Sequence, residues 1–564
     1  MIGKLIKLVR EEQGWQPDEL GEPEFSGAYI EALERGAIRP SRMALELIAK
    51  RLQLSPDRLL VVEPVIQQAH QQVEPDGGEA VRLQPDVKAY EEDLHFQLNY
   101  ATTLIHRSDV ENALSLINTV EVAVSPFSEQ LSIKARYRLP YLRGMANLQV
   151  GQPGAAQVEL ETALEVAGIP IAPSRMRSYP SGNDAVVATQ VKPSAQSGSR
   201  RTEEMVLHAA GDGRGGGTSG MGGAGHAGGT SGTSTHPEEP GDTEARIRNL
   251  LGVAYYMQKR LQDAEEQHMS CLHASEDGKI NDIGLRFSIY RNLANDYWAC
   301  GKYEQAITIS LEALRLFQDL ADPLRLAGLE WGLTMAYKAA GERGYAKLHA
   351  QKALDIYRAR EFPIATATMA INLAELLIDD GQYSEAEPLL AEAEVLLHSS
   401  DALVKLKVVA AVALTALSPE TAVPLTLSNL YQNRARLARA QGELHEASKQ
   451  ARQSIELAEA VYQAEAARAE STTGPGVAAA ASIHPTHYYA QALHTGALVE
   501  EAMGVHRAAD QLFERALALV EGTGFERARE AIMRSYADVL KARGDFQNAA
   551  RYLDQATQVR IGAR

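Results

Sequence analysis

Glycines that return at regular separations restrict the fold of this 564-residue chain more than any other feature. They stand at Gly301, Gly341, Gly381, Gly442, Gly504 and Gly544, with separations of 40, 40, 61, 62 and 40 residues. Glycine permits the tight turn between two helices, and helices can cross closely only where the facing side chains are small. The spacing therefore predicts a stack of helical hairpins, each turning at one of these glycines.

Small residues accompany every glycine in the same register. Alanine follows by five residues, a small residue follows by twelve, and another precedes by seven. These are Ala306, Ala346, Ala386, Ala447, Ala509 and Ala549; Ala313, Ala353, Ala393, Ser454, Ala516 and Ala556; and Ala294, Thr334, Ala374, Ala435, Ala497 and Ala537. Large residues such as Phe513, Tyr536, Phe546 and Leu553 should fill the space between the layers.

This pattern resembles tetratricopeptide repeats with lengthened helices. Weaker copies surround Ala113, Gly151 with Ala156, and Gly252 with Ala264, so about nine repeats are expected. Helix-favouring residues dominate, whereas alternating runs rich in valine and isoleucine are nearly absent. The fold class expected is all-α, with an α-solenoid of these repeats as its main part.

The first 60 residues read as five short helices, over 2–13, 17–20, 27–35, 42–52 and 56–60. Ser26 and Ser41 are predicted N-caps and Gly36 a helix stop. Residues 25–60, FSGAYIEALERGAIRPSRMALELIAKRLQLSPDRLL, resemble the second half of the helix-turn-helix domain of the phage-repressor (XRE) family. The residues that carry this resemblance are Tyr29-Ile30, Glu34-Arg35-Gly36, Pro40-Ser41 and the run from Ile48 to Leu52. The resemblance implies a small lambda-repressor-like helix-turn-helix domain ahead of the α-solenoid.

Composition shifts along the chain set the expected domain boundaries. Twelve of the 22 positions from Gly211 to Gly232 are glycine, which cannot bury enough apolar surface to order a segment. The expected organisation is a helix-turn-helix domain over 1–62, a linker over 63–85, repeats over 86–173, a disordered Gly/Ser-rich linker over 174–243, and repeats over 244–560 with a flexible insert at 470–485.

The resemblance implies that the helix beginning near Ser26 enters the DNA major groove. The candidate DNA-binding residues are Ser26, Gly27, Ala28, Tyr29, Glu31, Arg35, Arg39, Ser41 and Arg42. Relatives commonly carry arginine, serine or glutamine where this chain has Gly27, Ala28, Glu31 and Ala32, and a phosphate-binding glutamine where it has Pro17. Residues 1–60 also hold nine basic against ten acidic residues, so a domain retained for packing or protein contact is the open alternative.

Positions ten, six and three residues before each glycine share one helix face, because their spacings match helical periodicity. In tetratricopeptide arrays the first helix of each pair lines a concave wall that binds peptides. The candidate peptide- or protein-binding residues are Arg291, Asn295, Trp298, Trp331, Lys338, Arg436 and Arg439. Arginine can hold a carboxylate, and asparagine can bond both backbone groups of a bound strand.

Charge and composition limit which functions and which cellular compartments fit this chain. A net charge of −17 confines any DNA contact to a local surface, and two cysteines, Cys271 and Cys300, fit a reducing compartment. No apolar run is long enough for a signal sequence or a membrane span, so a cytoplasmic protein without a membrane partner is expected. The glycine run near Gly213 lacks a phosphate-loop lysine, and His484, His487 and His494 lack acidic or cysteine companions. We therefore expect no enzyme activity, cofactor or metal.

The two resemblances together imply a bacterial transcriptional regulator. Its helix-turn-helix domain would bind DNA, and its repeats would bind a peptide or protein signal, mediate oligomerisation such as homodimer formation, or do both. The alternative is a tetratricopeptide scaffold whose helix-turn-helix domain no longer binds DNA.

Overall fold

The computed structural model describes residues 2–38, 40–54, 87–170, 240–398, 419–472, 483–522 and 525–562. All regular structure in these ranges is helical, as expected, and no strand occurs within them. The predicted linker over 63–85, the predicted helix at 56–60 and most of the Gly/Ser-rich segment lie outside the described residues. Pro240 already begins a helix, so the repeats resume four residues earlier than the composition indicated.

The N-terminal domain consists of α1 (Ile2–Glu12), α2 (Pro17–Gly21), α3 (Gly27–Arg35) and α4 (Arg42–Arg51). Both predicted caps are confirmed. Ser26 Oγ accepts a hydrogen bond from the Tyr29 amide at 3.2 Å, and Ser41 Oγ accepts one from the Ala44 amide at 3.1 Å. Gly36 ends α3 with a left-handed φ of 73°.

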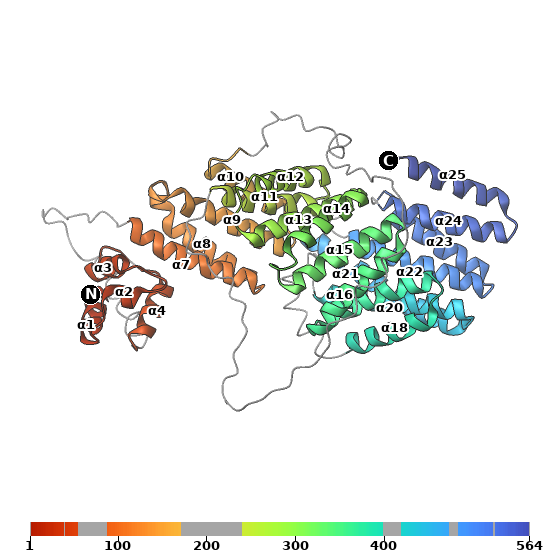
Figure 1. The fold of residues 1–564 in the computed structure, drawn as a ribbon, viewed down its shortest axis with the longest axis horizontal. Coiled ribbons are helices and arrows are strands. Elements are labelled where there is room, and N and C mark those ends of the chain that lie inside the picture. The colour runs from red at the N-terminus through yellow and green to blue at the C-terminus, as the bar shows by residue number, and fades with distance from the viewer. Residues whose placement is uncertain are drawn as a thin grey trace, which may run out of the picture. The chain divides into compact units, whose positions relative to one another are not determined.

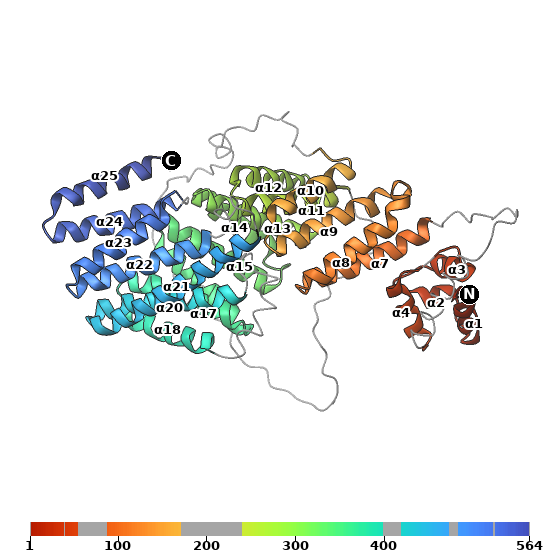
Figure 2. The same ribbon diagram turned by 180° about the vertical axis from the view of Figure 1, so that it is seen from behind.

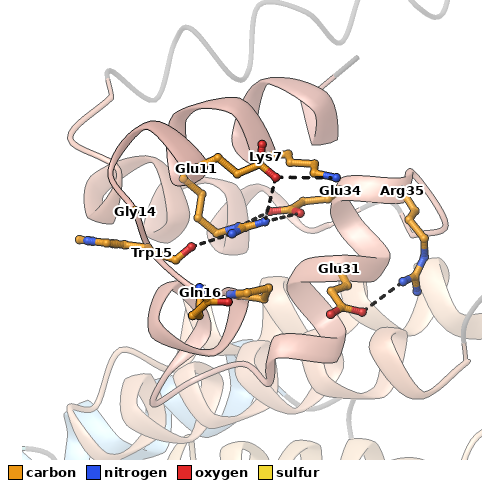
Figure 3. Close-up of a pocket in the computed structure, with 10 residues that line it drawn as sticks. Lys7, Glu11, Gly14, Trp15, Gln16, Glu31, Glu34 and Arg35 are labelled. Carbon is orange, nitrogen blue, oxygen red and sulfur yellow. Dashed lines mark hydrogen bonds and ion pairs between the residues drawn. The ribbon is translucent and has the colours of Figure 1, made fainter.

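A buried ion pair ties α1 to α3 in this domain. Arg10 Nε lies 2.6 Å from Glu34 Oε1, and Arg10 Nη2 donates to Glu34 Oε2 at 2.9 Å. Arg10 Nη1 also donates to the Trp15 carbonyl at 2.6 Å, which fixes the chain as it leaves α1. Figure 3 shows Glu34 turned toward α1, whereas Glu31 and Arg35 pair with each other along α3.

The described part of the chain then forms nine helix pairs, which follow one another in chain order (Figures 1 and 2). The pairs are α7 (Val87–His106) with α8 (Val110–Val124), α9 (Ile133–Gln149) with α10 (Pro153–Val166), α11 (Pro240–Met257) with α12 (Leu261–Glu276), α13 (Ile283–Ala299) with α14 (Tyr303–Phe317), α15 (Pro323–Ala340) with α16 (Arg343–Ala359), α17 (Pro363–Asp379) with α18 (Tyr383–His398), α20 (Pro419–Gln441) with α21 (Leu444–Thr472), α22 (Ile483–Ala502) with α23 (His506–Val520), and α24 (Glu526–Ala542) with α25 (Phe546–Gly562). A short 3-10 helix, Ser125–Gln130, links the first two pairs. The predicted insert at 470–485 is narrower than expected, since α21 continues to Thr472 and α22 begins at Ile483.

The predicted register of small residues is confirmed. All six repeat glycines adopt a positive φ between 74° and 87°, and the small residues five and twelve positions after them and seven before them are buried. In the weaker copies the same turn falls at Gly151 and at two residues that are not glycine, Ser108 (φ 61°) and Lys259 (φ 64°). The nine pairs therefore share one turn geometry even where the glycine is missing.

The expectation that Phe546 and Leu553 pack between layers is wrong. Phe546 is 66% exposed and Leu553 39% exposed. Both lie on α25, the second helix of the last described pair, so no following pair covers them. Phe513 on α23 and Tyr536 on α24, whose rings stack on each other where these two neighbouring pairs meet, are buried as predicted.

Contacts between pairs distinguish the two faces of the array. The first helices of successive pairs contact one another, as α11 does with α13, α13 with α15, α17 with α20, α20 with α22, and α22 with α24. Among the described helices, each second helix makes its main contacts with the helix before it and the helix after it. The row of first helices is therefore the more tightly curved face, which we call the inner wall.

The turn glycines provide a direct test of this geometry. Gly341→Ala is expected to destabilise the array by about 1–2 kcal/mol, because alanine is strained at a φ of 86°. Gly328→Ala, inside α15 with open space around the added methyl group, should instead stabilise it by up to about 1 kcal/mol. Urea unfolding followed by circular dichroism distinguishes the two signs.

Candidate ligand-binding wall

The inner wall carries the residues that the helix-face argument selected. Arg291, Asn295 and Trp298 lie on α13, and Trp331 and Lys338 lie on α15. Trp298 is 38% exposed, whereas Trp331 is partly buried against the core formed by α15–α18. Trp298 is therefore the more accessible of the two tryptophans for an apolar contact with a ligand.

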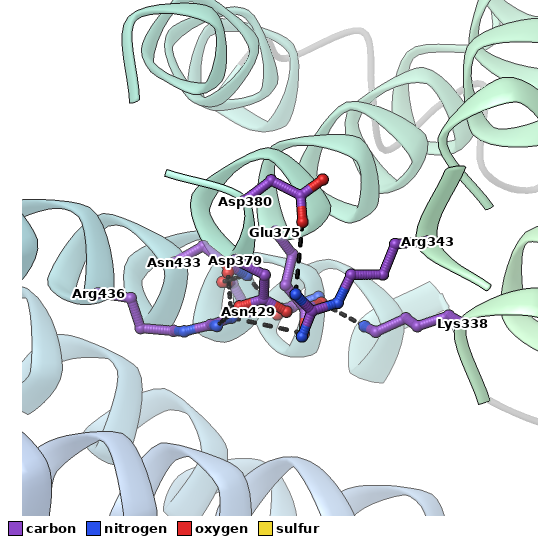
Figure 4. A network of polar contacts seen from close by, with 8 residues as sticks. All are labelled: Lys338, Arg343, Glu375, Asp379, Asp380, Asn429, Asn433 and Arg436. Carbon is purple, nitrogen blue, oxygen red and sulfur yellow. Dashed lines mark hydrogen bonds and ion pairs between the residues drawn. The ribbon is translucent and has the colours of Figure 1, made fainter. Parts of the chain in front are cut away.

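A polar network joins three successive first helices of the wall (Figure 4). Lys338 Nζ on α15 lies 2.6 Å from Glu375 Oε2 on α17, and Arg436 Nη1 on α20 lies 3.5 Å from Glu375 Oε1. Arg436 also pairs with Asp379 on α17. Burial alone would raise the pKa of Glu375, but Lys338 and Arg436 outweigh it and hold that pKa below its usual value. Two predicted ligand-binding cations are thus already paired with wall carboxylates.

Sequence reasoning missed Glu375, although the signal was present. Glu375 stands six residues before Gly381, which is the position that Asn295 and Arg436 occupy before their own glycines. The three corresponding positions on this helix are Ile371, Glu375 and Ile378, none of which is a cation.

Arg439 lies one turn beyond Arg436 on α20 and is not neutralised in the same way. No hydrogen bond or ion pair joins Arg439 to another described residue, and burial together with Arg436 lowers its pKa. Gln432 on the same helix is buried, and its Oε1 has no hydrogen-bond partner within the described ranges. Two polar groups on one helix face thus have no partner within the residues that the structure describes.

His494 on α22 lies near enough to Arg436 and Arg439 for their charges to act on it. Burial, Arg436 and Arg439 lower its pKa to about 4, so the imidazole is neutral at pH 7. Its Nε2 has no hydrogen-bond partner among the described residues, and its ring lies 5.8 Å from that of Phe513. We call Gln432, Arg436, Arg439 and His494 the polar cluster.

A second cationic site lies on α13. Burial, with a further contribution from Arg325, lowers the pKa of Arg291 to about 10. Arg291 Nε has no hydrogen-bond partner in the part of the chain that the structure describes. A guanidinium that is partly desolvated without a counter-charge is costly, so both Arg291 and Arg439 favour an incoming anion.

The polar cluster predicts an acid-sensitive fold. The folded state keeps His494 neutral down to about pH 4, whereas an unfolded histidine takes up its proton near pH 6.5. The unfolded state therefore binds more protons between these values, and stability falls as the pH is lowered from 6.5 to 4, by no more than about 3 kcal/mol. Urea midpoints at pH 7 and pH 5 should differ less in His494→Gln than in the wild type.

The predicted DNA-binding residues divide into two groups. Ala28, Glu31, Arg35 and Arg42 are exposed, with Arg35 paired to Glu31 at 3.3 Å and Arg42 paired to Glu46 at 2.8 Å. Arg39 lies outside the described residues.

The pocket of about 570 Å³ between α1, α2 and α3 is lined by three basic and three acidic residues, so it favours neither sign of charge (Figure 3).

Two of the candidate DNA-binding residues, Gly27 and Tyr29, lie in the interior of the domain and not on its surface. Tyr29 is fully buried, and its ring stacks on Phe25 with centroids 4.2 Å apart. Gly27 is buried against α2, where an added methyl group would meet Asp18. Helical periodicity places Tyr29 beside Ile30 and Leu33 on the face that forms the domain core.

Ser26 and Ser41 are engaged by α7 of the first repeat pair. Ser26 donates from its amide and its hydroxyl to Glu92, and Ser41 donates from the same two groups to Asp93. Sequence reasoning gave no signal for this contact, because the two segments are separated by more than 50 residues.

Residues 287–321 and 366–393 match the family model described as tetratricopeptide repeat. The chain contains tetratricopeptide repeats. The matched residues cover most of α13 with α14 and most of α17 with α18, and the other described pairs have the same helix–turn–helix arrangement. No curated protein matches the chain significantly.

Solved structures that align with this chain include the apo form of the quorum sensor NprR from B. thuringiensis, at 12% identity, covering 83% of this chain and 99% of that one with a TM-score of 0.49. A Rap protein complexed with competence and sporulation factor is also 12% identical, covering 84% and 99% with a TM-score of 0.47. Aspartyl phosphate phosphatase F from Bacillus subtilis is 12% identical, covering 86% and 96% with a TM-score of 0.44. Within the described ranges, no helix combines the length and the apolar character needed to cross a bilayer.

Proposed function

We propose that this protein is a regulator whose tetratricopeptide wall binds an acidic peptide or polypeptide segment and whose N-terminal domain binds DNA. The observation that carries the first part is a set of partly buried polar groups on the wall that have no hydrogen-bond partner among the described residues: Arg291 Nε, Gln432 Oε1, the Arg439 guanidinium and His494 Nε2. Each would gain a partner from a ligand that carries carboxylates and amide groups.

The chemistry of the wall favours a peptide over a small anion. A carboxylate can accept two hydrogen bonds from the guanidinium of Arg439, and the amides of Asn295 and Gln432 match the donors and acceptors of a peptide backbone. Trp298 adds an exposed apolar surface on the same row of helices. Such a wall acts by binding and not by catalysis.

Binding of an acidic peptide tests this part of the proposal. We expect Arg439→Gln to weaken binding of a fluorescein-labelled ten-residue glutamate-rich peptide by about tenfold, the loss of one charge-assisted contact. The matched control is Arg434→Gln, which removes an arginine on the same helix that pairs with Glu394. Fluorescence anisotropy at low salt measures both affinities, and equal losses in the two variants would contradict a specific role for the polar cluster.

Two observations favour a scaffold that does not bind DNA as the second candidate. The exposed arginines of the N-terminal domain are paired with neighbouring glutamates, and Ser26 and Ser41 are occupied by α7. A scaffold would bind the acidic peptide but leave duplex DNA unbound at low salt whatever the state of α7.

A further inference from the structure

Three successive carboxylates on α7 each accept hydrogen bonds from a serine that begins another helix. Glu91 accepts from the amide of Ser132, the N-cap of α9. Glu92 accepts from Ser26, the N-cap of α3, and Asp93 accepts from Ser41, the N-cap of α4. One turn of α7 therefore connects the N-terminal domain to the first two repeat pairs.

The two contacts with the N-terminal domain are bidentate. The Ser26 amide lies 2.9 Å from Glu92 Oε2, and the Ser26 hydroxyl lies 2.8 Å from Glu92 Oε1. The Ser41 amide lies 2.5 Å from Asp93 Oδ2, and the Ser41 hydroxyl lies 2.6 Å from Asp93 Oδ1. Each carboxylate thus uses both oxygens on the backbone and side-chain donors of one N-cap residue.

These donors are of the kind that hold nucleic-acid phosphates. Backbone amides and serine hydroxyls at helix N-termini bind phosphate oxygens, and the helix dipole favours an anion there. A carboxylate has the same charge sign and the same acceptor chemistry as a phosphate. Glu92 and Asp93 therefore occupy donors that a DNA backbone would otherwise use.

Apolar packing supports this contact. Ala89 is buried in the core of the N-terminal domain, and Tyr90 and Phe96 pack against it, with the Phe96 ring 5.0 Å from that of Phe25. Burial raises the pKa of Asp93, and the hydrogen bonds from Ser41 only partly offset that effect. The incompletely compensated burial of a carboxylate favours a contact that can be released.

We infer that α7 holds the N-terminal domain in an autoinhibited position, with Glu92 and Asp93 covering the N-termini of α3 and α4 that would contact DNA phosphates. This inference rests on the proposed DNA-binding function. Because α7 is the first helix of the first repeat pair, the inhibitory contact belongs to the same row of helices that forms the inner wall.

The test compares full-length variants in binding to a labelled 30-base-pair duplex pool of randomised sequence at 50 mM salt. A randomised pool is suitable because phosphate contacts are independent of sequence. Glu92→Gln with Asp93→Asn should bind the pool at least tenfold more tightly than the wild type. The matched control is Glu91→Gln with Glu111→Gln, which removes the same charge from α7 and α8 without touching a contact to the N-terminal domain.

Hydrogen exchange of the amides at the starts of α3 and α4 provides a readout that does not involve DNA. Faster exchange there, together with tighter DNA binding, supports autoinhibition. Equal, measurable DNA binding by the double variant, its control and the wild type would overturn autoinhibition while leaving DNA binding intact. Absence of DNA binding in every form, with faster exchange in the double variant, would overturn the DNA-binding proposal and the inference with it. Glu92→Gln alone, with an intermediate effect expected, serves if the double variant does not fold.

Discussion

Phe513→Ala should lower the free energy of unfolding of the C-terminal repeats by about 3–5 kcal/mol, the range for emptying a buried phenylalanine site. The ring of Phe513 is fully buried on α23, stacks on Tyr536 of α24 at a centroid separation of 4.5 Å and lies beside His494 of α22. Three helices from two pairs therefore border the cavity, and they are held apart by their own backbone packing. Hydrogen exchange of the amides in α22–α25 measures the loss of stability in these repeats, and urea unfolding measures its effect on the whole chain.

Phe546→Ala is the matched control for Phe513→Ala. The same atoms are removed, but Phe546 is 66% exposed on the terminal helix, so the expected change is below about 0.5 kcal/mol. Similar losses in the two variants would show that Phe513 is not packed between layers, and the layered description of the repeats would have to be abandoned.

Arg10→Met should destabilise the N-terminal domain by about 3 kcal/mol, because it leaves the Glu34 carboxylate buried without its counter-charge. The side chains of Arg10 and Glu34 are only 8% and 6% exposed. The substitution also removes the donor to the Trp15 carbonyl. The domain described here spans only residues 2–54, so a loss of this size is a large fraction of its stability. Thermal unfolding followed by tryptophan fluorescence measures this loss. Trp298 and Trp331 are replaced by phenylalanine in every variant compared, so that the signal comes from Trp15 alone.

Arg35→Met provides the comparison for Arg10→Met within the same domain. Arg35 and Glu31 form an exposed pair, with side chains 60% and 56% exposed, and such pairs contribute roughly 0–1 kcal/mol. If Arg35→Met lowered the melting temperature as much as Arg10→Met, the buried pair could not be what ties α1 to α3.

Local rules predicted much of the fold. The N-caps Ser26 and Ser41, the turn at Gly36 and the buried small residues of six repeat pairs follow from contacts within one helix or between neighbouring helices. The turns at Ser108 and Lys259 were missed, because the glycine that marks the turn elsewhere is absent there. Phe546 was misplaced because periodicity identifies a helix face but not whether another helix covers it.

The candidate sites were harder to predict. Arg436 and Arg439 stand three residues apart with similar sequence surroundings, yet Glu375 and Asp379 from another repeat pair neutralise only Arg436. The hydrogen bonds from Ser26 to Glu92 and from Ser41 to Asp93 likewise join segments that are distant in the sequence. Spacing within a sequence indicates which side chains share a face, but not which charges on that face meet a partner.

Because the turns at Ser108 and Lys259 lack glycine, the nine helix pairs should differ in stability. A left-handed conformation costs a residue other than glycine roughly 1–2 kcal/mol. The α7–α8 and α11–α12 hairpins are therefore less stable by this amount than they would be with glycine at the turn. In a linear array each link is supported mainly by its neighbours, and fraying under heat or mechanical load should start at the weakest ones. The α7–α8 hairpin contains the helix whose carboxylates bind the N-terminal domain. The contact between α7 and that domain would therefore be lost before the rest of the array unfolds.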